Sequence, residues 1–471
     1  MILLLLILIP FVSGLIGFLW KSESVKVWTL ITSLFTLLIA LLACQINVNN
    51  GLSFNQSWIS SLGARFMLSG TAMSVTLTLL TAIVFPVIFI AQWNKPVADI
   101  HRFSGLMLMA QAGLMGVFLA NDLLLFYFFW ELALIPVYFL CSTWGGEKRI
   151  PVTFKFFVYT FLGSLLMLAG VIYLYLQTPD RSFAWDAIRA AGEALPAMEQ
   201  NIVFCLFFIA FGIKMPVFPF HTWQPDAYEQ SSTPVTIVLS ALMVKMGLFA
   251  TVKWLVNIMP GATAYWSDVI MTLAVIGIIY ASLLAMVQSD LKRLIAYSSI
   301  AHIGLMAMGI FAGTEIAMNG LMVQMFNHGI NITGMWLIVA MIEQRYGTRN
   351  MRELGGMAGS APTMAIALVI IAFANIALPL TNGFVGEFML FHGIFQSASP
   401  YHITFMVLAG LGVILGAVYT LNMVQKVAYG EAKTNAVVTD VSRNELLGLI
   451  VVIGIIIILG VYPKLLLDML V

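Results

Sequence analysis

The chain has 471 residues, of which 61% are hydrophobic and only 9% are charged, and its formal net charge is +1. Because a soluble domain has about 25% charged residues, this composition excludes a soluble globular protein, and the near-neutral charge argues against a nucleic-acid partner. Apolar runs long enough to cross a bilayer recur along the whole chain with no long polar segment between them. The sequence therefore predicts an all-α polytopic membrane protein embedded in the lipid bilayer.

The apolar runs begin at the N-terminus. The first, MILLLLILIPFVSGLIGFLW, has no basic segment and no small-residue cleavage site, which favours a retained helix over a signal peptide. Hydropathy predicts about 14 transmembrane helices in all. They are expected at residues 2–19, 27–45, 72–92, 104–120, 123–143, 153–176, 201–219, 234–258, 267–288, 294–312, 319–343, 361–397, 403–425 and 445–465.

Two of the predicted helices contain helix-breaking residues. In the stretch 201–230, which begins with the seventh predicted helix and includes AFGIKMPVFPFHTWQPDAYEQ (210–230), Pro216 and Pro219 interrupt the apolar run. The twelfth, at 361–397, is too long for one straight span and contains Pro379 in the stretch LPLTNG. We therefore expect helices 7 and 12 to be broken inside the membrane.

The two breaks lie five predicted helices apart, which indicates a repeated unit of five helices. We expect a first repeat at 104–258 (helices 4–8) and a second at 259–430 (helices 9–13), between N-terminal helices 1–3 at 1–103 and a C-terminal helix at 431–471. Because five is odd, the second repeat must cross the membrane upside down relative to the first. Paired broken helices in inverted repeats are typical of secondary transporters, where they mark the ion site.

Basic residues are distributed unequally between the two sides of the predicted bundle. Most lysines and arginines, such as Lys148, Arg149 and Arg293, lie in odd-numbered connections, and few lie in even-numbered ones. The positive-inside rule therefore predicts that the odd connections face the cytoplasm and that both termini lie on the non-cytoplasmic side. Lys214 and Lys245 fit neither group, because both lie inside apolar runs.

Four ionisable residues are predicted to lie inside the membrane: Glu131, Lys214, Lys245 and Glu387. A charge in that position is costly unless it is neutralised or paired. One interpretation is that buried ion pairs fix the packing of the helices. Because two of the four residues lie beside helix breaks, we favour proton transfer, in which a buried lysine changes protonation as a carboxylate approaches or leaves.

Three histidines are candidates for extending a proton relay: His221 after the first break, His302 in IAYSSIAHIGL and His328 in VQMFNHGINITG. Each could equally be hydrogen-bonded to a neighbouring helix, and no matched pair suggests haem ligation. The three cysteines are scattered singly, and no phosphate-binding loop or metal-ligand spacing is present in the sequence. We therefore expect no cofactor in this chain, and expect another chain or an ion gradient to supply the driving force.

Several long stretches resemble one family, the antiporter-like subunits of respiratory complex I. The resemblance lies in FYFFWELALIPVYFLCSTWGGEKR, KMPVFPFHTWQPDAYEQSSTPV, FNHGINITGMWLIVAMIEQRYGTR and LPLTNGFVGEFMLF, and it extends over residues 100–430. Within the family, L-type and N-type subunits carry a lysine in the second broken helix, where this chain has Glu387. The chain also ends at Val471 without the long lateral helix of the L type, so the resemblance favours the M-type branch.

The resemblance implies a role for each intramembrane charge. Glu131 and Lys214 correspond to an ion pair between helices 5 and 7, Lys245 to a central lysine of helix 8, and Glu387 to a terminal acid of helix 12. The three histidines resemble residues of the hydrophilic axis that joins them.

The resemblance also implies a proton-translocating membrane-arm subunit of NADH:quinone oxidoreductase in the bacterial inner membrane. FMN, iron–sulfur clusters and quinone would belong to partner subunits, and L-type and N-type subunits would be membrane neighbours. The alternatives are a subunit of a multisubunit cation/proton antiporter, a subunit of a membrane-bound hydrogenase, or a passive scaffold.

Overall fold

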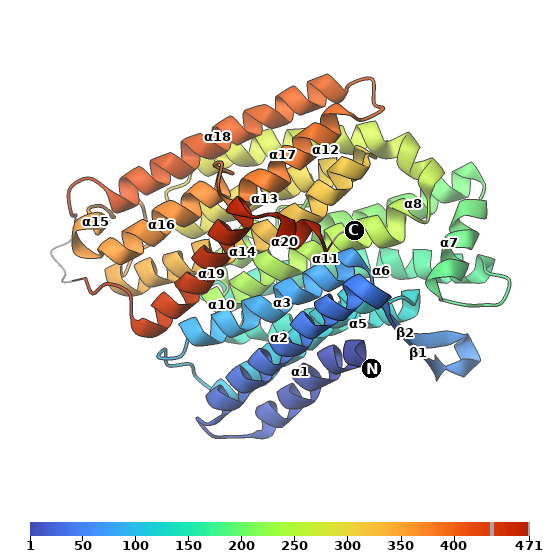
Figure 1. The fold of residues 1–471 in the computed structure, drawn as a ribbon, viewed down its shortest axis with the longest axis horizontal. Helices are drawn as coiled ribbons and strands as arrows, with labels where there is room; N and C mark the ends of the chain where they lie inside the picture. The colour runs from blue at the N-terminus through green and yellow to red at the C-terminus, as the bar shows by residue number, and fades with distance from the viewer. Residues whose placement is uncertain (434–437, 470–471) are drawn as a thin grey trace.

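The computed structural model describes residues 1–433 and 438–469 and shows an elongated bundle of helices (Figure 1). Within these residues, 13 helices are long and apolar enough to cross a membrane. They are α1 (Ile2–Leu19), α2 (Val25–Asn50), α3 (Ala72–Ala91), α4 (Ile100–Leu119), α5 (Leu123–Trp144), α6 (Arg149–Gln177), α8 (Ala197–Lys214), the continuous helix Thr233–Val256, α12 (Pro260–Val287), α13 (Leu291–Phe311), α14 (Glu315–Tyr346), α18 (His402–Ala428) and α19 (Arg443–Val461).

A further crossing is divided into two short helices, α16 (Pro362–Asn375) and α17 (Asn382–Phe395). With this pair, the prediction of an all-α membrane bundle of about 14 helices is confirmed in the part of the chain that the structure describes. The continuous helix Thr233–Val256 consists of α10 (Thr233–Ile237), the π-helical stretch η2 (Val238–Met243), α11 (Val244–Ala250) and the π-helical stretch η3 (Thr251–Val256). Short helices complete the fold: α7 (Trp185–Ala194), α9 (Gln224–Gln230), α15 (Met357–Ser360) and α20 (Lys464–Leu467).

A β-hairpin occupies the stretch between α2 and α3, where hydropathy predicts no membrane helix. β1 (Leu52–Ile59) and β2 (Ala64–Gly70) pair antiparallel, and a 3₁₀ turn, η1 (Ser60–Leu62), joins them. Phe66 of the hairpin meets Phe129 of α5 with ring centroids 6.1 Å apart. Hydropathy misses this element because its strands are short and alternate between polar and apolar residues, which lowers their mean hydropathy.

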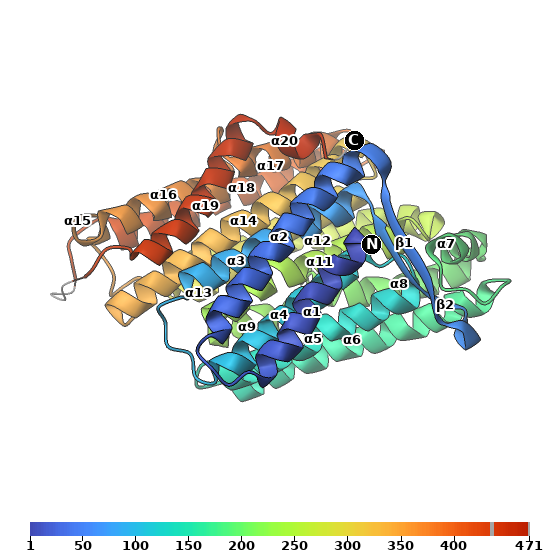
Figure 2. The same ribbon diagram turned by 60° about the horizontal axis from the view of Figure 1, so that its bottom comes forward.

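The two ends of the bundle carry different connections between the helices. Both termini lie at the end that also carries the hairpin and α7, which we call the terminal face (Figures 1 and 2). The other end, the opposite face, carries the connections between α3 and α4, α5 and α6, α12 and α13, and α14 and α15.

The helices also differ in how deeply they are buried. The apolar segments of α14 and of the helix Thr233–Val256 are fully buried, whereas those of α1, α6, α18 and α19 are largely exposed. The exposed helices present Leu, Ile and Phe outward, as lipid-facing helices do.

Close contact between α14 and α17 depends on glycine. A Cβ atom added at Gly393 would lie 2.4 Å from the backbone nitrogen of Ala317, and one at Gly386 would lie 2.4 Å from Oε1 of Gln324. Small residues permit such close approach between helices in a membrane. The approach brings α17, which carries Glu387, against α14, which carries His328.

A buried ion pair joins the end of α14 to the start of α19. The guanidinium of Arg345 donates to both carboxylate oxygens of Glu445, at 3.2 and 2.6 Å, and the two side chains are only 10% and 6% exposed. Glu445 also completes a capping box with Ser442. Asp440, in the segment before α19, accepts N–H bonds from Thr363 and Met364 at the start of α16. Burial acts to raise the pKa of Asp440, but these hydrogen bonds outweigh it and hold the pKa below the usual value.

We expect Arg345→Met to destabilise this end of the bundle by about 3–5 kcal/mol, because it leaves the Glu445 carboxylate buried without its cation. The double variant Arg345→Met with Glu445→Gln should recover part of the loss, since it also removes the uncompensated charge and preserves the cap oxygen. The effect is measured by heating the purified assembly and recording the temperature at which this chain is lost from it. Equal stability of wild type and single variant would show that the pair contributes nothing.

Candidate proton-translocation site

The first helix break places Lys214 at the end of α8. The side chain of Lys214 is 2% exposed, and the chain leaves the helix directly after it, before α9 begins at Gln224. The indole N–H of Trp223 donates to the carbonyl of Ile213 at 2.9 Å, which satisfies one of the backbone groups released by the break. The predicted break in helix 7 is thus confirmed.

The second break lies between α16 and α17, as predicted for helix 12. Ala377 and Leu380 adopt positive φ angles of 55° and 73°, which are strained for residues other than glycine. Asn331 of α14 donates to the carbonyl of Ala374 at 3.1 Å, and Asn327 donates to the carbonyl of Asn382 at 2.7 Å. Side chains of a neighbouring helix therefore replace the backbone bonds that the break removes.

Lys245 lies at the centre of the bundle on α11 and is fully buried. Its ammonium nitrogen is 2.8 Å from Nδ1 of His328 on α14 and donates to the carbonyl of Ser240 at 2.9 Å. Ser240 belongs to the π-helical stretch η2, five residues before Lys245. The wider π-helical turn thus presents a carbonyl to the ammonium, in keeping with the frequent occurrence of such turns at functional sites.

Glu387 on α17 contacts His302 on α13. The carboxylate oxygen Oε1 of Glu387 is 3.1 Å from Nδ1 of His302, and the same oxygen accepts from Gln324 at 3.3 Å. The rings of His302 and His328 lie with their centroids 5.5 Å apart. A chain of ionisable groups therefore runs from Lys245 through His328 and His302 to Glu387. The structure brings together four of the seven predicted site residues in one row.

The row has one interruption. Both histidines use Nδ1 for their outer partners, Lys245 and Glu387 respectively, and the Nε2 atom of each ring is buried without a hydrogen-bond partner. Because buried polar atoms are nearly always satisfied by protein or water, the two free nitrogens indicate where water or a ring rotation would complete the row.

A small cavity adjoins the Glu387 end of the row. Its volume is about 30 Å³, and its lining includes His302, Asn375, Glu387 and Tyr419. This volume and these polar groups suit one or two water molecules. The hydroxyl of Tyr419 donates to Ser298 at 2.9 Å. The cavity thus provides space for water beside the carboxyl group of Glu387.

Lys214 and Glu131 do not form the expected direct ion pair. Nζ of Lys214 and Oε1 of Glu131 are both buried without a hydrogen-bond partner, and no ion pair joins these two residues. The ammonium lies instead 5.3 Å from the ring centroid of Trp130, in cation–π geometry. Glu131 is partly exposed on α5, on the same side of the helix as the exposed residues Phe128 and Ile135. Glu131 thus lies on the outer side of the bundle, although Oε1 is covered, while Lys214 lies inside the bundle.

His221 lies apart from the row. Its ring meets Phe218 and Tyr280, with centroids 5.7 and 5.4 Å apart, and its buried Nδ1 has no partner. No hydrogen bond within the described residues joins His221 to Lys245, His302 or His328. Its proposed place in the relay therefore stays a prediction.

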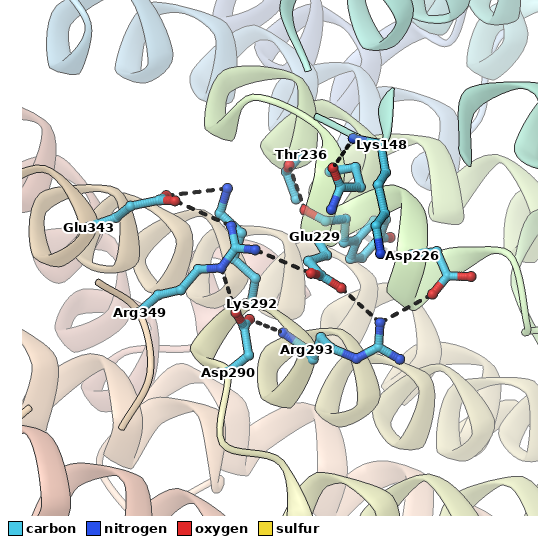
Figure 3. A network of polar contacts seen from close by, with 11 residues as sticks. Lys148, Asp226, Glu229, Thr236, Asp290, Lys292, Arg293, Glu343 and Arg349 are labelled. Carbon is cyan, nitrogen blue, oxygen red and sulfur yellow. Dashed lines mark hydrogen bonds and ion pairs between the residues drawn. The ribbon is translucent and has the colours of Figure 1, made fainter. Parts of the chain in front are cut away.

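A network of alternating charges covers the opposite face (Figure 3). Arg293 of α13 donates to Asp226 at 3.1 Å and to Glu229 at 2.8 Å, both on α9, and Arg349 contacts Glu229 at 3.2 Å. The remaining members are Lys155, Asp290, Lys292 and Glu343. The network ties α9, the second half of the first broken helix, to α6, α13 and the segment after α14. It borders a cleft of about 720 Å³ lined in part by Glu229, Asp290, Lys292, Glu343 and Arg349.

Sequence reasoning identified the charged site residues but missed their polar neighbours. Gln324, Asn327 and Asn331 were missed; with the predicted His328 they are all buried on α14 and follow the i, i+3, i+4, i+7 spacing of one helix face. That polar stripe inside an apolar helix was the signal that could have revealed them. The acids of the opposite face were missed as partners because ion pairing between distant segments has no local pattern.

Comparison with known proteins places this geometry in one family. Residues 120–420 match the family described as NADH:quinone oxidoreductase/Mrp antiporter, TM. NADH-quinone oxidoreductase subunit M of Rickettsia typhi is 35% identical over 88% of this chain and 83% of the relative. The subunit M of Rhodobacter capsulatus is 35% identical over 94% and 87%, and chain 4 of the NAD(P)H-quinone oxidoreductase of Acaryochloris marina is 34% identical over 94% and 85%.

Solved structures with the same fold include a chain of the same kind of complex. A chain of respiratory complex I from Thermus thermophilus superposes with a TM-score of 0.90 at 26% identity, and the match covers all of both chains. A chain of an archaeal membrane-bound sulfane sulfur reductase and one of the Mrp complex from Dietzia share the fold, with TM-scores of 0.89 and 0.86 at 23% and 20% identity. The chain therefore belongs to the NADH:quinone oxidoreductase/Mrp antiporter transmembrane family, in its subunit M and chain 4 branch.

Proposed function

We propose that this chain carries protons across the membrane along the row Lys245–His328–His302–Glu387, as the M-type membrane-arm subunit of a proton-pumping NADH:quinone oxidoreductase. The observation that carries the proposal is the row itself: four ionisable side chains from four different helices meet inside an apolar bundle. Ionisable groups are rare at such depth and mark proton pathways when they occur in series.

Nζ of Lys245 and Nδ1 of His328 share one hydrogen bond, so one proton lies between the two nitrogens. Either a charged Lys245 donates to the free Nδ1 of His328, or an Nδ1–H donates to a neutral Lys245. Lys245 passes its proton to His328 in the first case, and the imidazole then releases a proton from Nε2. A water molecule or a ring rotation between the two Nε2 atoms carries this proton to His302. Nδ1 of His302 in turn contacts Glu387. Glu387 exchanges the proton with the adjoining cavity.

Lys214 and Glu131 provide the control of this transfer. An ammonium without a carboxylate partner is costly in an apolar bundle, so its charge depends on how near Glu131 lies. Because Glu131 lies at the outer boundary of the bundle, a charge in a neighbouring subunit can draw it outward or release it. The charge on Lys214 then raises or lowers the energy of a proton on Lys245. The basic opposite face would be cytoplasmic by the positive-inside rule, with both termini on the far side of a bacterial inner membrane.

Lys214→Ala should lower the number of protons pumped per electron in the reconstituted complex, because Glu131 then has no cation to control. Proton uptake by proteoliposomes during NADH oxidation measures the ratio. Lys214→Arg should restore part of it, since the guanidinium retains the charge beside Trp130 but does not deprotonate. An unchanged ratio in the alanine variant would remove Lys214 from the mechanism.

The partners and cofactors follow from the same assignment. FMN, iron–sulfur clusters and quinone would be held by other subunits, and L-type and N-type subunits would adjoin this one in the membrane. Purification of the native assembly tests this directly. Flavin and iron–sulfur absorbance with NADH oxidation supports the oxidoreductase, whereas an assembly without redox cofactors would be a cation/proton antiporter, and one containing nickel would be a hydrogenase.

A passive scaffold is the remaining alternative. Neutralising Glu131 and Lys214 together should then alter assembly but leave coupling intact. The unpaired arrangement of these two groups argues for a controlled charge, because residues that only fix packing are expected to be paired.

A further inference from the structure

Another buried lysine, Lys253, lies outside both the proton row and the ion network of the opposite face. It belongs to the π-helical stretch η3 near the terminal face, and its side chain is 6% exposed. Nζ donates to the carbonyl of Ala120 at 2.8 Å and lies 5.4 Å from the ring centroid of Trp254. No carboxylate in the described ranges 1–433 and 438–469 forms an ion pair with it. A buried ammonium without an anion requires an explanation.

Lys253 borders a cavity of about 360 Å³. The cavity lies between the junction of β2 and α3, the start of α7, η3 and the first turns of α14. Lys253 is the only charged residue in its lining, and Met73, Met318 and Met322 are among its apolar lining residues. Its size falls within the range of small-molecule sites, and methionines adapt readily to flexible chains.

A second unused donor lies at the wall of the cavity. Trp185, at the start of α7, contributes to the lining, and its indole N–H is buried without a hydrogen-bond partner. The ammonium of Lys253 has three N–H groups and one protein hydrogen bond. Because the lining contains no acid, these donors favour an anionic acceptor, and the polar residues Thr71 and Asn257 border the same space.

We propose that this cavity binds an anionic phospholipid of the surrounding bilayer. Its phosphate oxygens would accept hydrogen bonds from Lys253 and Trp185, and an acyl chain would lie along the three methionines. The position at the terminal end of the bundle, beside the amphipathic helix α7, suits a headgroup at the membrane boundary. A free fatty acid presents the same chemistry, with a carboxylate in place of the phosphate.

Capping of α4 by Lys253 is the simpler explanation of its bond to Ala120, because lysines stabilise the ends of helices in this way. Capping explains neither the cavity nor the free indole N–H. The two explanations differ in what they predict for lipid binding, so they can be separated by experiment.

The test uses the whole complex in phosphatidylcholine nanodiscs that contain phosphatidylglycerol with a photoreactive diazirine in one acyl chain. Irradiation should label peptides that contain Met73 or Met318–Met322 at least fivefold more than photoreactive phosphatidylcholine does. Lys253→Gln should reduce this labelling to the phosphatidylcholine level, whereas Lys464→Gln, at an exposed lysine on the terminal face, should leave it unchanged.

A second variant keeps the proposal testable if Lys253→Gln fails to assemble. Met73→Trp narrows the cavity where the acyl chain would lie and preserves Lys253 and its bond to Ala120, so it should strongly reduce labelling without loss of the subunit. Labelling by photoreactive palmitate that depends on Lys253, without labelling by phosphatidylglycerol, would support the same site with a fatty acid as its ligand. Equal labelling by the two phospholipids, or full labelling in either variant, would overturn the proposal. Proton pumping is measured separately and does not decide this result.

Discussion

Replacing Lys245 with methionine should remove the protons that this chain contributes to pumping. Methionine preserves much of the side-chain volume but provides no proton for Nδ1 of His328, which Lys245 meets at 2.8 Å. Loss of one essential proton-transfer group typically slows a step by about 10²–10⁴-fold, so the route would be closed on the timescale of turnover. The proton-to-electron ratio of reconstituted complex measures the effect.

The matched control for this variant is Lys426→Met on α18. Lys426 is exposed and lies near the end of its helix, so the same chemical change there should leave the ratio at the wild-type value. His328→Gln in the same assay should resemble Lys245→Met, because it interrupts the row at the next position. A wild-type ratio in both variants would show that protons take another path.

Replacing Glu387 with glutamine should produce a comparable loss at the other end of the row. Glutamine can still hydrogen-bond to His302 and Gln324, so α17 should keep its position against α14. It cannot exchange a proton, and the proton delivered by His302 would remain in the row. We therefore expect pumping through this chain to fall as far as in Lys245→Met, with normal assembly of the complex.

Two further variants separate acid chemistry from packing at this position. Glu387→Asp retains a titratable carboxyl on a shorter side chain and should keep measurable pumping. Glu315→Gln, at an exposed acid in the first turn of α14, should have no effect. Full pumping by Glu387→Gln would show that His302 releases its proton elsewhere, for example directly to the cavity beside it.

The two breaks differ in what surrounds them, although the sequence treats them alike. The half-helix after the first break, α9, is fixed by the ion network of the opposite face, through Asp226 and Glu229. The half-helix after the second, α17, is fixed by close packing of Gly386 and Gly393 against α14. Ion pairs therefore fix α9, whereas close packing fixes α17. The division of the chain into inverted repeats at 104–258 and 259–430 stays a prediction.

Some elements could be predicted because their signal is local. A bilayer requires long apolar runs, so hydropathy alone located nearly every crossing, including α14 and α18. Proline within such a run breaks a helix wherever it occurs, so both breaks were predictable from Pro216 and Pro379. The β-hairpin was not, since its short strands with alternating polar residues resemble a loop to any hydropathy window.

By itself the sequence determined which residues are exceptional: Glu131, Lys214, Lys245, Glu387 and the histidines stand out because charge is costly in an apolar run. Only the tertiary structure decided how they are connected. It joins Lys245 to His328 and His302 to Glu387, leaves Lys214 beside Trp130 without Glu131, and sets His221 apart. The physical reason is that the cost of burying a charge depends on the residue and its local surroundings, whereas its partner comes from another helix. The packing of α13, α14, α17 and the helix Thr233–Val256 brings together partners that lie as far apart in the sequence as Lys245 and Glu387.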